Sequence, residues 1–177
     1  MGSTPARRAI MKVMQSQKVV AFFYEGDVME IIEVLTHNKK DYFLKLLDDC
    51  EWVAGRYLLK MIETGDLFKL CGEDSRVYML VNNDDIVSFC TFVHQDEINA
   101  PHMSPWIGFV YTYPKYRGQR NFGKLLHHIL EVAKSEGHNH LFVSTIETGL
   151  YEKYGFVYYD NMNDITGNPS RIYKIEF

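Results

Sequence analysis

The stretch Pro114–Leu126, PKYRGQRNFGKLL, decides the fold, because it joins a strand-like run to an amphipathic helix. Before it, Trp106–Tyr113 is almost continuously apolar and aromatic, as expected of a strand buried on both faces. After it, a helix is predicted up to about Glu136, and its apolar stripe comprises Phe122, Leu125, Leu126, Ile129, Leu130 and Ala133. Leu141–Ile146 is the next predicted strand. This order is a βαβ unit, whose two strands should be parallel with a right-handed crossover.

Hairpins are predicted on both sides of this unit. Val77–Val81 and Ile86–Val93 are β-branched and aromatic runs around the turn residues Asn82–Asp85. Phe156–Asp160 and Arg171–Phe177 are predicted as terminal strands. The predicted fold class is therefore α+β, or α/β-like, with a mixed and mostly antiparallel sheet around a central parallel βαβ unit.

The first 70 residues are predicted to be mostly helical. Apolar residues recur at helical spacing in Gly26–Leu35 and Lys40–Leu47, and a further helix is predicted from about Glu51 to Glu63, where Gly65-Asp66 ends it. Val19–Tyr24 is the one strand predicted there. Neither a repeat nor a Pro/Ser-rich linker divides the chain, so we expect one continuous domain.

Composition restricts the classes of function. The chain has 177 residues, 46% of them apolar, which suits one globular domain with a core of its own. A net charge of −4 argues against broad nucleic-acid binding. The sequence predicts neither a membrane span nor a signal peptide, and Cys50, Cys71 and Cys90 lack metal or CxxC spacing. We expect free thiols in a reducing cytoplasm and no metal.

The basic turn at Arg117-Gly-Gln-Arg120 is a candidate phosphate site. The first N–H groups of a helix lack intrahelical acceptors, and the helix dipole adds partial positive charge there. Two arginines at this point worsen the local electrostatics unless an anion binds, so a phosphate or pyrophosphate receptor is predicted. An ordinary strand-to-helix turn with exposed arginines is the alternative. The spacing fits neither a P-loop nor a dinucleotide-binding glycine motif.

Two segments in order resemble the GCN5-related N-acetyltransferases (GNAT superfamily). Tyr113–Gln119, YPKYRGQ, is similar to the strand end and Q/R-x-x-G-x-G/A loop of that family, and Gly149–Phe156, GLYEKYGF, is similar to its Y-x-x-x-G-F segment. One helix and one strand separate the two, as that fold requires. The resemblance covers roughly Arg76–Phe177. It implies an acetyl-CoA-binding core over residues 71–177 and an N-terminal portion, residues 1–70, that shapes the acceptor side.

The loop departs from the family pattern at two positions. Counted from Arg117, it places Arg120 and Phe122 where the family usually has glycine and a small residue. A register shifted by one places Asn121 and Gly123 there instead. We prefer the first register, in which Phe122 must point into the core.

The resemblance also implies which residues bind acetyl-CoA. Backbone groups of Val110, Tyr111 and Thr112 would hold the pantetheine and polarise the acetyl carbonyl, as an oxyanion site does. The pyrophosphate would lie on Arg117, Gly118, Gln119, Arg120, Asn121, Phe122 and Gly123. Ser144 stands where the family often has an asparagine, seven residues before its tyrosine, and completes the cofactor-binding candidates.

Transfer of an acetyl group to an amine needs a base for the ammonium and an acid for the leaving thiolate. Tyr151 occupies the position of the family's tyrosine and is the predicted general acid. Glu147, directly after a predicted strand, is the predicted base, with Asp96 and Glu97 as alternatives.

The acceptor side is predicted from the N-terminal portion of the chain. Trp52 and Trp106 are candidates for an acceptor pocket, and Glu51–Tyr57 is the segment where substrate choice is expected. The predicted partner is an amine of a small molecule or a peptide, with no nucleic acid or membrane. Terminal strands in this fold can pair between subunits, so a homodimer stays open.

Two other functions stay open beside an N-acetyltransferase. One is an acyl-CoA-binding or regulatory module of the same fold without turnover. The other is an interaction domain whose arginines contact a protein or an RNA phosphate.

Overall fold

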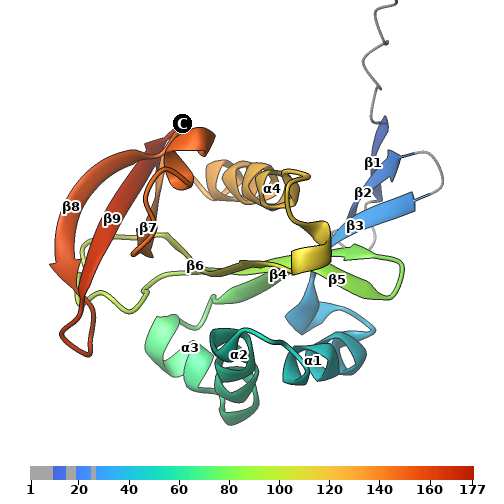
Figure 1. Cartoon of the computed structure of the whole chain (residues 1–177), viewed down its shortest axis with the longest axis horizontal. Coiled ribbons are helices and arrows are strands. Elements are labelled where there is room, and N and C mark those ends of the chain that lie inside the picture. Colours follow the sequence, from blue (N-terminus) through green and yellow to red (C-terminus); the bar gives the residue numbers. More distant parts are fainter. Residues whose placement is uncertain (1–9, 15–18, 25–26) are drawn as a thin grey trace, which may run out of the picture.

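The computed structural model describes residues 10–14, 19–24 and 27–177, with side chains from Met29 onward. Its centre is a nine-stranded sheet with the strand order β1-β2-β3-β4-β5-β6-β7-β9-β8 (Figure 1). The strands are β1 Ile10–Met14, β2 Val19–Tyr24, β3 Asp27–Glu33, β4 Arg76–Asn82, β5 Asp85–Val93, β6 Trp106–Thr112, β7 His140–Thr145, β8 Val157–Asn163 and β9 Pro169–Glu176. The α-helices are α1 Lys40–Asp48, α2 Val53–Thr64, α3 Asp66–Cys71 and α4 Asn121–Ser135.

The sheet is mixed and mostly antiparallel, which confirms the predicted fold class. The pair β6 and β7 is parallel, and every other neighbouring pair of described strands is antiparallel. Helix α4 connects the two parallel strands, so the predicted βαβ unit is present.

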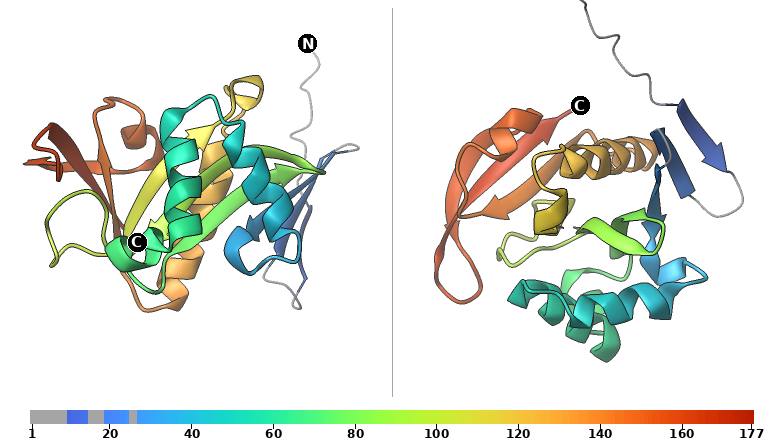
Figure 2. Two further views of the ribbon diagram at one scale, coloured as in Figure 1. Left: turned by 90° about the horizontal axis from the view of Figure 1, so that it is seen from below. Right: turned by 45° about the vertical axis from the view of Figure 1, so that its right-hand side comes forward.

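Helices cover both faces of this sheet. Figures 1 and 2 show α1, α2 and α3 on one face and α4 on the other. Each face has its own apolar core. Leu47, Leu58 and Phe89 are buried on the side of the first three helices, whereas Leu125 and Ile129 are buried beneath α4.

Helix α4 forms because its apolar residues repeat at helical spacing. Phe122, Leu125, Leu126, Ile129 and Ala133 are all buried, and Leu130 is half-buried against the same core. The inward orientation of Phe122 confirms the expectation tied to the preferred loop register.

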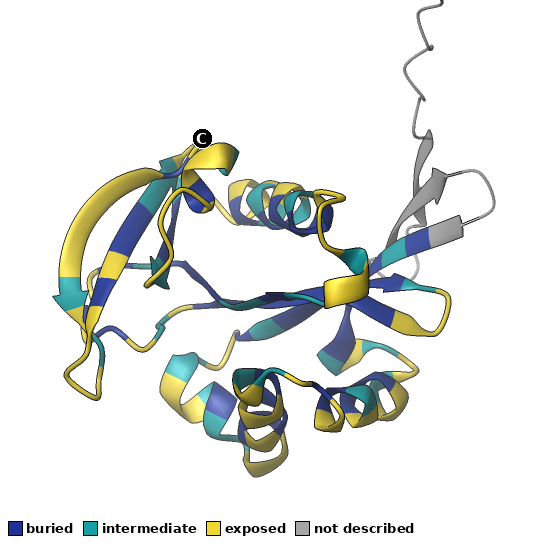
Figure 3. Ribbon diagram, in the orientation of Figure 1, coloured by how far each residue is buried: buried dark blue, intermediate teal, exposed yellow. Residues whose placement is uncertain are grey.

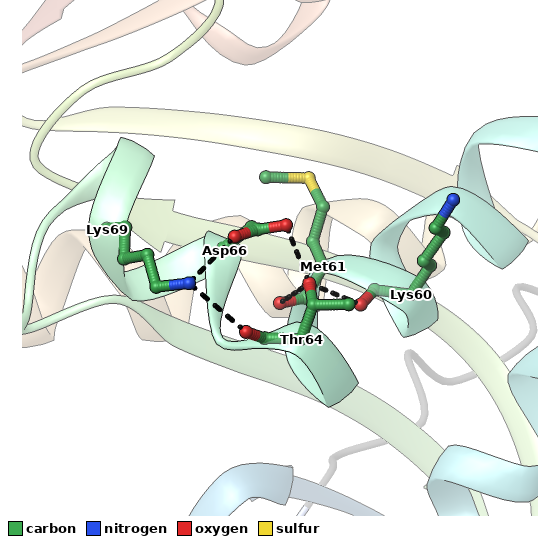
Figure 4. A network of polar contacts seen from close by, with 5 residues as sticks. All are labelled: Lys60, Met61, Thr64, Asp66 and Lys69. Atoms are coloured by element: carbon green, nitrogen blue, oxygen red, sulfur yellow. Dashed lines mark hydrogen bonds and ion pairs between the residues drawn. The ribbon is translucent and has the colours of Figure 1, made fainter.

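The junction of α2 and α3 is stabilised by local polar contacts (Figure 4). Gly65, at φ 73°, ends α2 in the left-handed conformation that glycine adopts at little cost. Thr64 Oγ1 donates to Asp66 Oδ2 at 2.8 Å, and Lys69 Nζ donates to Asp66 Oδ1 at 3.1 Å. Asp66 therefore begins a third helix directly after the glycine, where the sequence predicted only a turn.

The prediction of a helix over Gly26–Leu35 is wrong. Strand β3 occupies Asp27–Glu33, and a short 3-10 turn, Val34–Thr36, follows it. The buried Met29 and Ile31 lie on one face of the sheet and Ile32 on the other, so the run MEII alternates as a strand does. This short run is compatible with both a helical and an alternating pattern, and its pairing with β2 and β4 makes it a strand. The strand predicted over Val19–Tyr24 is confirmed, and β1 was not predicted.

Burial falls from the centre of the sheet to its C-terminal edge. Figure 3 shows the central strands mostly buried and β8 mostly exposed. Along β8 only Met162 is half-buried, whereas the other residues are exposed, as befits an edge strand. In the described part of the chain, no helix combines the length and the apolar character that crossing a membrane requires.

Candidate active site

A cleft opens where β6 and β7 separate. Only Trp106↔Phe142 and Ile107↔Val143 are paired between them, so among the described residues the rest of β6 has no strand partner on that side. The cleft has a volume of about 750 Å³. Its walls come from the start of α2, the loop after β5, strands β6 and β7, the segment up to Tyr151, and the β8–β9 turn.

A β-bulge in β6 shapes this cleft. Thr91 lies opposite Gly108, yet Phe89 lies opposite Tyr111, so β6 holds one residue more than β5. Phe109 accommodates the extra residue of the bulge by adopting φ 49°, a left-handed conformation that is costly for a bulky side chain. The bulge lies on the cleft wall, where Gly108, Phe109, Val110 and Tyr111 follow one another.

The loop before α4 presents unpaired backbone donors at the start of the helix. Gly118, at φ 76°, and Arg120, at φ 56°, are both left-handed, and no side chain caps the helix. Within the described part of the chain, no acceptor is found for the backbone N–H groups from Arg120 to Gly123. These donors, the helix dipole and two arginines combine at one point, as the sequence predicts for a phosphate receptor.

Several polar contacts hold this loop in place. Asp85, the first residue of β5, accepts from Lys115 Nζ at 2.8 Å and from Tyr116 OH at 3.0 Å. Buried Asn121 donates from Nδ2 to Tyr116 O at 2.9 Å. Arg117 turns back toward β6, where its Nε donates to Thr112 O at 2.9 Å and its guanidinium lies over the Tyr111 ring. Arg117 therefore lines the cleft as well.

Tyr151 lies in the cleft wall and is 5% exposed. The rings of Phe122, Phe156 and Tyr173 surround it. Burial raises the pKa of its phenol, and nearby negative groups, Asp96 and Glu147 among them, add to the rise. The hydroxyl therefore keeps its proton at neutral pH, which suits a proton donor.

Asp96 is the carboxylate with the most perturbed environment. Burial raises its pKa from 3.8 to about 7, and the charge of Glu97 contributes to this rise. A Cβ on Gly108 would lie 3.2 Å from Asp96 Oδ1 and 2.9 Å from Thr91 Oγ1, so both oxygens lie over the bulged strand. A carboxyl group with a pKa near 7 can exchange protons at neutral pH.

Two further predicted residues line the cleft but are engaged differently. Glu147 lies on its exposed rim, and its backbone N–H donates to Thr145 Oγ1 at 3.0 Å. Ser144 Oγ shares a 2.6 Å hydrogen bond with Ser170 Oγ and lies 3.4 Å from Glu97 Oε1. The Ser144 hydroxyl is therefore already bonded to side chains of the cleft wall.

The two tryptophans have different positions. Trp52 lines the cleft and stacks on Tyr111, with ring centroids 5.2 Å apart. Trp106 is fully buried, and its Nε1 donates to Met103 O at 2.5 Å. The prediction that Trp106 lines an acceptor pocket is wrong, because the parallel pairing with Phe142 places it where the sheet is closed.

Comparison with known proteins identifies the family. The model of the acetyltransferase (GNAT) domain matches residues 32–159. The chain belongs to the GNAT acetyltransferase family. No curated protein matches the sequence.

Solved GNAT structures have the same fold. A Bordetella pertussis protein described as a GNAT-family acetyltransferase has a TM-score of 0.62 and 11% identity over 86% of this chain and 98% of its own. An acetyltransferase from Streptococcus agalactiae has a TM-score of 0.58 and 23% identity over 87% of this chain and 100% of its own. A GNAT acetyltransferase from Elizabethkingia anophelis, solved with acetyl-CoA bound, has a TM-score of 0.54 and 17% identity, also covering 87% and 100%.

The structure brings six of the thirteen predicted site residues of this GNAT chain together in one cleft. Val110, Tyr111, Arg117, Ser144, Glu147 and Tyr151 line one cleft, and so do the alternative bases Asp96 and Glu97. Thr112 and the loop from Gly118 to Gly123 lie beyond its lining.

Sequence reasoning missed several residues of the cleft. Asp164 comes from the β8–β9 turn, far along the chain, and Phe109 gives no local sign of its left-handed backbone. Gly108 was the available signal, because glycine inside a strand often marks a bulge. Around the cleft, as elsewhere in the described residues, no three His, Cys, Asp or Glu side chains are grouped as metal ligands would be.

The raised pKa of Asp96 predicts a pH-dependent stability. The unfolded chain loses this proton near pH 4 and the folded chain near pH 7, so in that interval the folded state binds more protons. The contribution of Asp96 to the free energy of unfolding is fully present below about pH 4 and is lost as the pH rises to about 7. Denaturant unfolding of Asp96→Asn across this range should show a smaller fall in the free energy of unfolding than the wild type. The exposed Asp48→Asn on α1 is the control and should keep the wild-type slope; equal slopes in all three proteins would contradict the assignment.

Proposed function

We propose that this GNAT chain transfers an acetyl group from acetyl-CoA directly to an amine of a small molecule or a peptide. The observation that carries the proposal is the set of unpaired N–H groups and arginines at the start of α4, beside a cleft that contains a buried phenol and a carboxyl group with a pKa raised to about 7. The free cysteines Cys50, Cys71 and Cys90 fit action in a reducing cytoplasm.

The residues present fit acetyl-CoA. The free N–H groups of Arg120–Gly123, with Gly118 and Gln119 before them, would hold the pyrophosphate, and Arg117 and Arg120 would neutralise it. The unpaired edge of β6 at Val110, Tyr111 and Thr112 would hold the pantetheine amides and polarise the thioester carbonyl. When bound there, acetyl-CoA supplies an activated acyl carbon.

Asp96 suits the role of general base better than Glu147. At neutral pH it is close to half-ionised, so it can take a proton from an ammonium group and return it to water. It also lies over Gly108 on the same face of the sheet as α2, where the acceptor is expected, whereas Glu147 is exposed on the rim. The uncharged amine would then attack the acetyl carbon.

Tyr151 is proposed to complete the proton balance. A carbon–nitrogen bond forms, the carbon–sulfur bond breaks, and the leaving thiolate takes the phenolic proton of Tyr151. The second proton of the attacking nitrogen passes to solvent or to the base, and the phenol is reprotonated from water. The products are an N-acetylated acceptor and free CoA.

Calorimetry with acetyl-CoA tests the cofactor assignment. The wild type should bind both acetyl-CoA and CoA, and Arg120→Ala should weaken both affinities by about tenfold, because a charge-assisted contact to phosphate is lost. Lys134→Ala, at the other end of α4, removes the same charge and should bind as the wild type does. Failure to bind either ligand would leave the interaction domain as the surviving hypothesis. Binding without thiol release across an amine panel would favour the non-catalytic acyl-CoA module.

Removing the Tyr151 hydroxyl should affect turnover rather than binding. Tyr151→Phe is expected to lower kcat by about a hundredfold or more, since one acid group contributes on that order, while the Kd for acetyl-CoA stays unchanged. Tyr154→Phe, in the same helical turn, is the matched control and should retain kcat. Wild-type turnover in Tyr151→Phe would exclude it as the acid.

The pH profile tests the base. In the wild type, kcat/KM should rise with pH and level off above about pH 7, as the free enzyme's Asp96 ionises. Asp96→Asn should have a low kcat/KM that does not rise as the pH approaches 7, whereas Glu147→Gln should keep that rise. The reverse pattern would assign the base to Glu147.

A further inference from the structure

One buried hydroxyl in strand β5 lacks a hydrogen bond. Thr91 is 1% exposed, and within the described part of the chain no hydrogen-bond partner is found for its Oγ1. The residue lies behind the cleft and is not part of its lining. A buried polar atom without a partner destabilises the folded state, so its place in the structure requires an explanation.

The missing side chain of Gly108 brings this hydroxyl close to Asp96. Thr91 and Gly108 are opposite each other in the register of β5 and β6. A Cβ on Gly108 would lie 2.9 Å from Thr91 Oγ1 and 3.2 Å from Asp96 Oδ1, so the two oxygens face the same point. The left-handed backbone of the bulge begins only at Phe109. The space over Gly108, and not its backbone freedom, is therefore the feature that joins the hydroxyl and the carboxylate.

Asp96 is the acceptor that this geometry offers to Thr91. The Thr91 oxygen is itself buried, so bulk solvent does not supply the missing bond. Asp96 is half-buried beside the open cleft and accepts a hydrogen bond from the backbone N–H of Glu97. A carboxylate has about four acceptor positions, so it can take a second donor. A rotation of the Asp96 side chain brings Oδ1 to the hydroxyl.

No cation is paired with Asp96 among the described residues. The titratable groups that face it are Glu97 from its own loop, Cys71 from the end of α3, and Tyr151 from the turn after β7. The other charged residues of the cleft lining are Arg117, Glu147 and Asp164. On its buried side, the ionised carboxylate therefore depends on neutral donors.

We propose that Thr91 is a positioning residue, whose hydroxyl donates to the ionised Asp96 carboxylate over Gly108 and holds it in the orientation that receives the acceptor's proton. The inference rests on the proposed function, in which Asp96 is the base. Thr91 acts through Asp96 alone, since it lies outside the cleft lining. A hydrogen bond to an ionised carboxylate is stronger than one to the neutral carboxyl group, so Thr91 favours the ionised base.

Titration of Asp96 in the free protein tests this contact. Thr91→Val replaces the hydroxyl with a methyl group of similar size and should move the midpoint of the Asp96 titration to higher pH by about one pH unit. Thr91→Ser keeps a hydroxyl and should retain the wild-type midpoint. The midpoint is measured by carbon NMR of the side-chain carboxyl groups, with Asp96→Asn to assign the signal. Equal midpoints in the wild type and in Thr91→Val would overturn the inference.

A second variant tests the space over Gly108. Gly108→Ala places a methyl group between the two oxygens and should raise the midpoint of the Asp96 titration as Thr91→Val does. This variant leaves the threonine in place, so it also applies where valine disturbs the packing of β5. A wild-type midpoint in Gly108→Ala would contradict the contact over this glycine.

The pH profile of turnover separates this inference from the proposed function. In Thr91→Val the rise of kcat/KM with pH should move to higher pH by the same amount, while the Kd for acetyl-CoA stays unchanged. In an Asp96→Asn background, Thr91→Val should not alter the pH profile further, because the hydroxyl acts only through Asp96. A shift that persists without Asp96 would overturn the inference. Absence of acetylation with every amine would count against the proposed function, and the NMR midpoint would still decide the contact.

Discussion

The short parallel contact between β6 and β7 is the constraint on which the rest of the molecule depends. Two residue pairs join these strands, whereas β7 pairs with β9 along its whole length, from His140 to Thr145. The C-terminal strands are thus attached to the main sheet through a narrow seam. Beyond that seam the backbone edge of β6 is free, and a cleft must open. Helix α4 begins on the same side, because it connects these two strands and no others.

Local patterns were sufficient for the elements that build this seam. The stripe on α4 and the apolar run of β6 each lie within a few turns of chain, so their periodicity identified them. The run Met29-Glu-Ile-Ile32 is short enough to satisfy both a helical and an alternating pattern. Its state depends on pairing with β4, more than forty residues away, and no local signal contains that information.

The same distinction explains which site residues could be predicted. Tyr151 and the loop from Arg117 to Gly123 lie within motifs and could be placed by their order along the chain. The difference between Asp96 and Glu147 depends on burial, which is set by packing over Gly108 and not by either residue's neighbours. For Trp106 the local sequence suggested the wrong position. It is an aromatic residue beside a predicted site and was a candidate for the pocket, yet it is buried where β6 and β7 are paired.

Charges of opposite sign lie in different parts of this region. Free N–H groups and arginines lie at the start of α4, whereas four carboxylates, from Asp96, Glu97, Glu147 and Asp164, line the cleft itself. A net charge of −4 conceals this arrangement, because it averages a basic and an acidic region. An anion would therefore be attracted to the start of α4 and a cation to the cleft.

The departures of the loop from the family pattern have a structural explanation. Arg120 adopts φ 56°, the left-handed conformation that glycine would take more cheaply, and so keeps the shape of the turn while adding a charge. Phe122 packs against both Tyr151 and Tyr154, with ring centroids 5.9 Å and 5.2 Å apart. A Cβ on Gly123 would lie 3.0 Å from Tyr154 Cε1, so a larger residue there would require the Tyr154 ring to shift. The first turn of α4 and the turn that holds Tyr151 are therefore one packed unit. In such a unit the N–H donors at the start of α4 and the phenol of Tyr151 keep a fixed relation, and Phe122 is the residue that joins them.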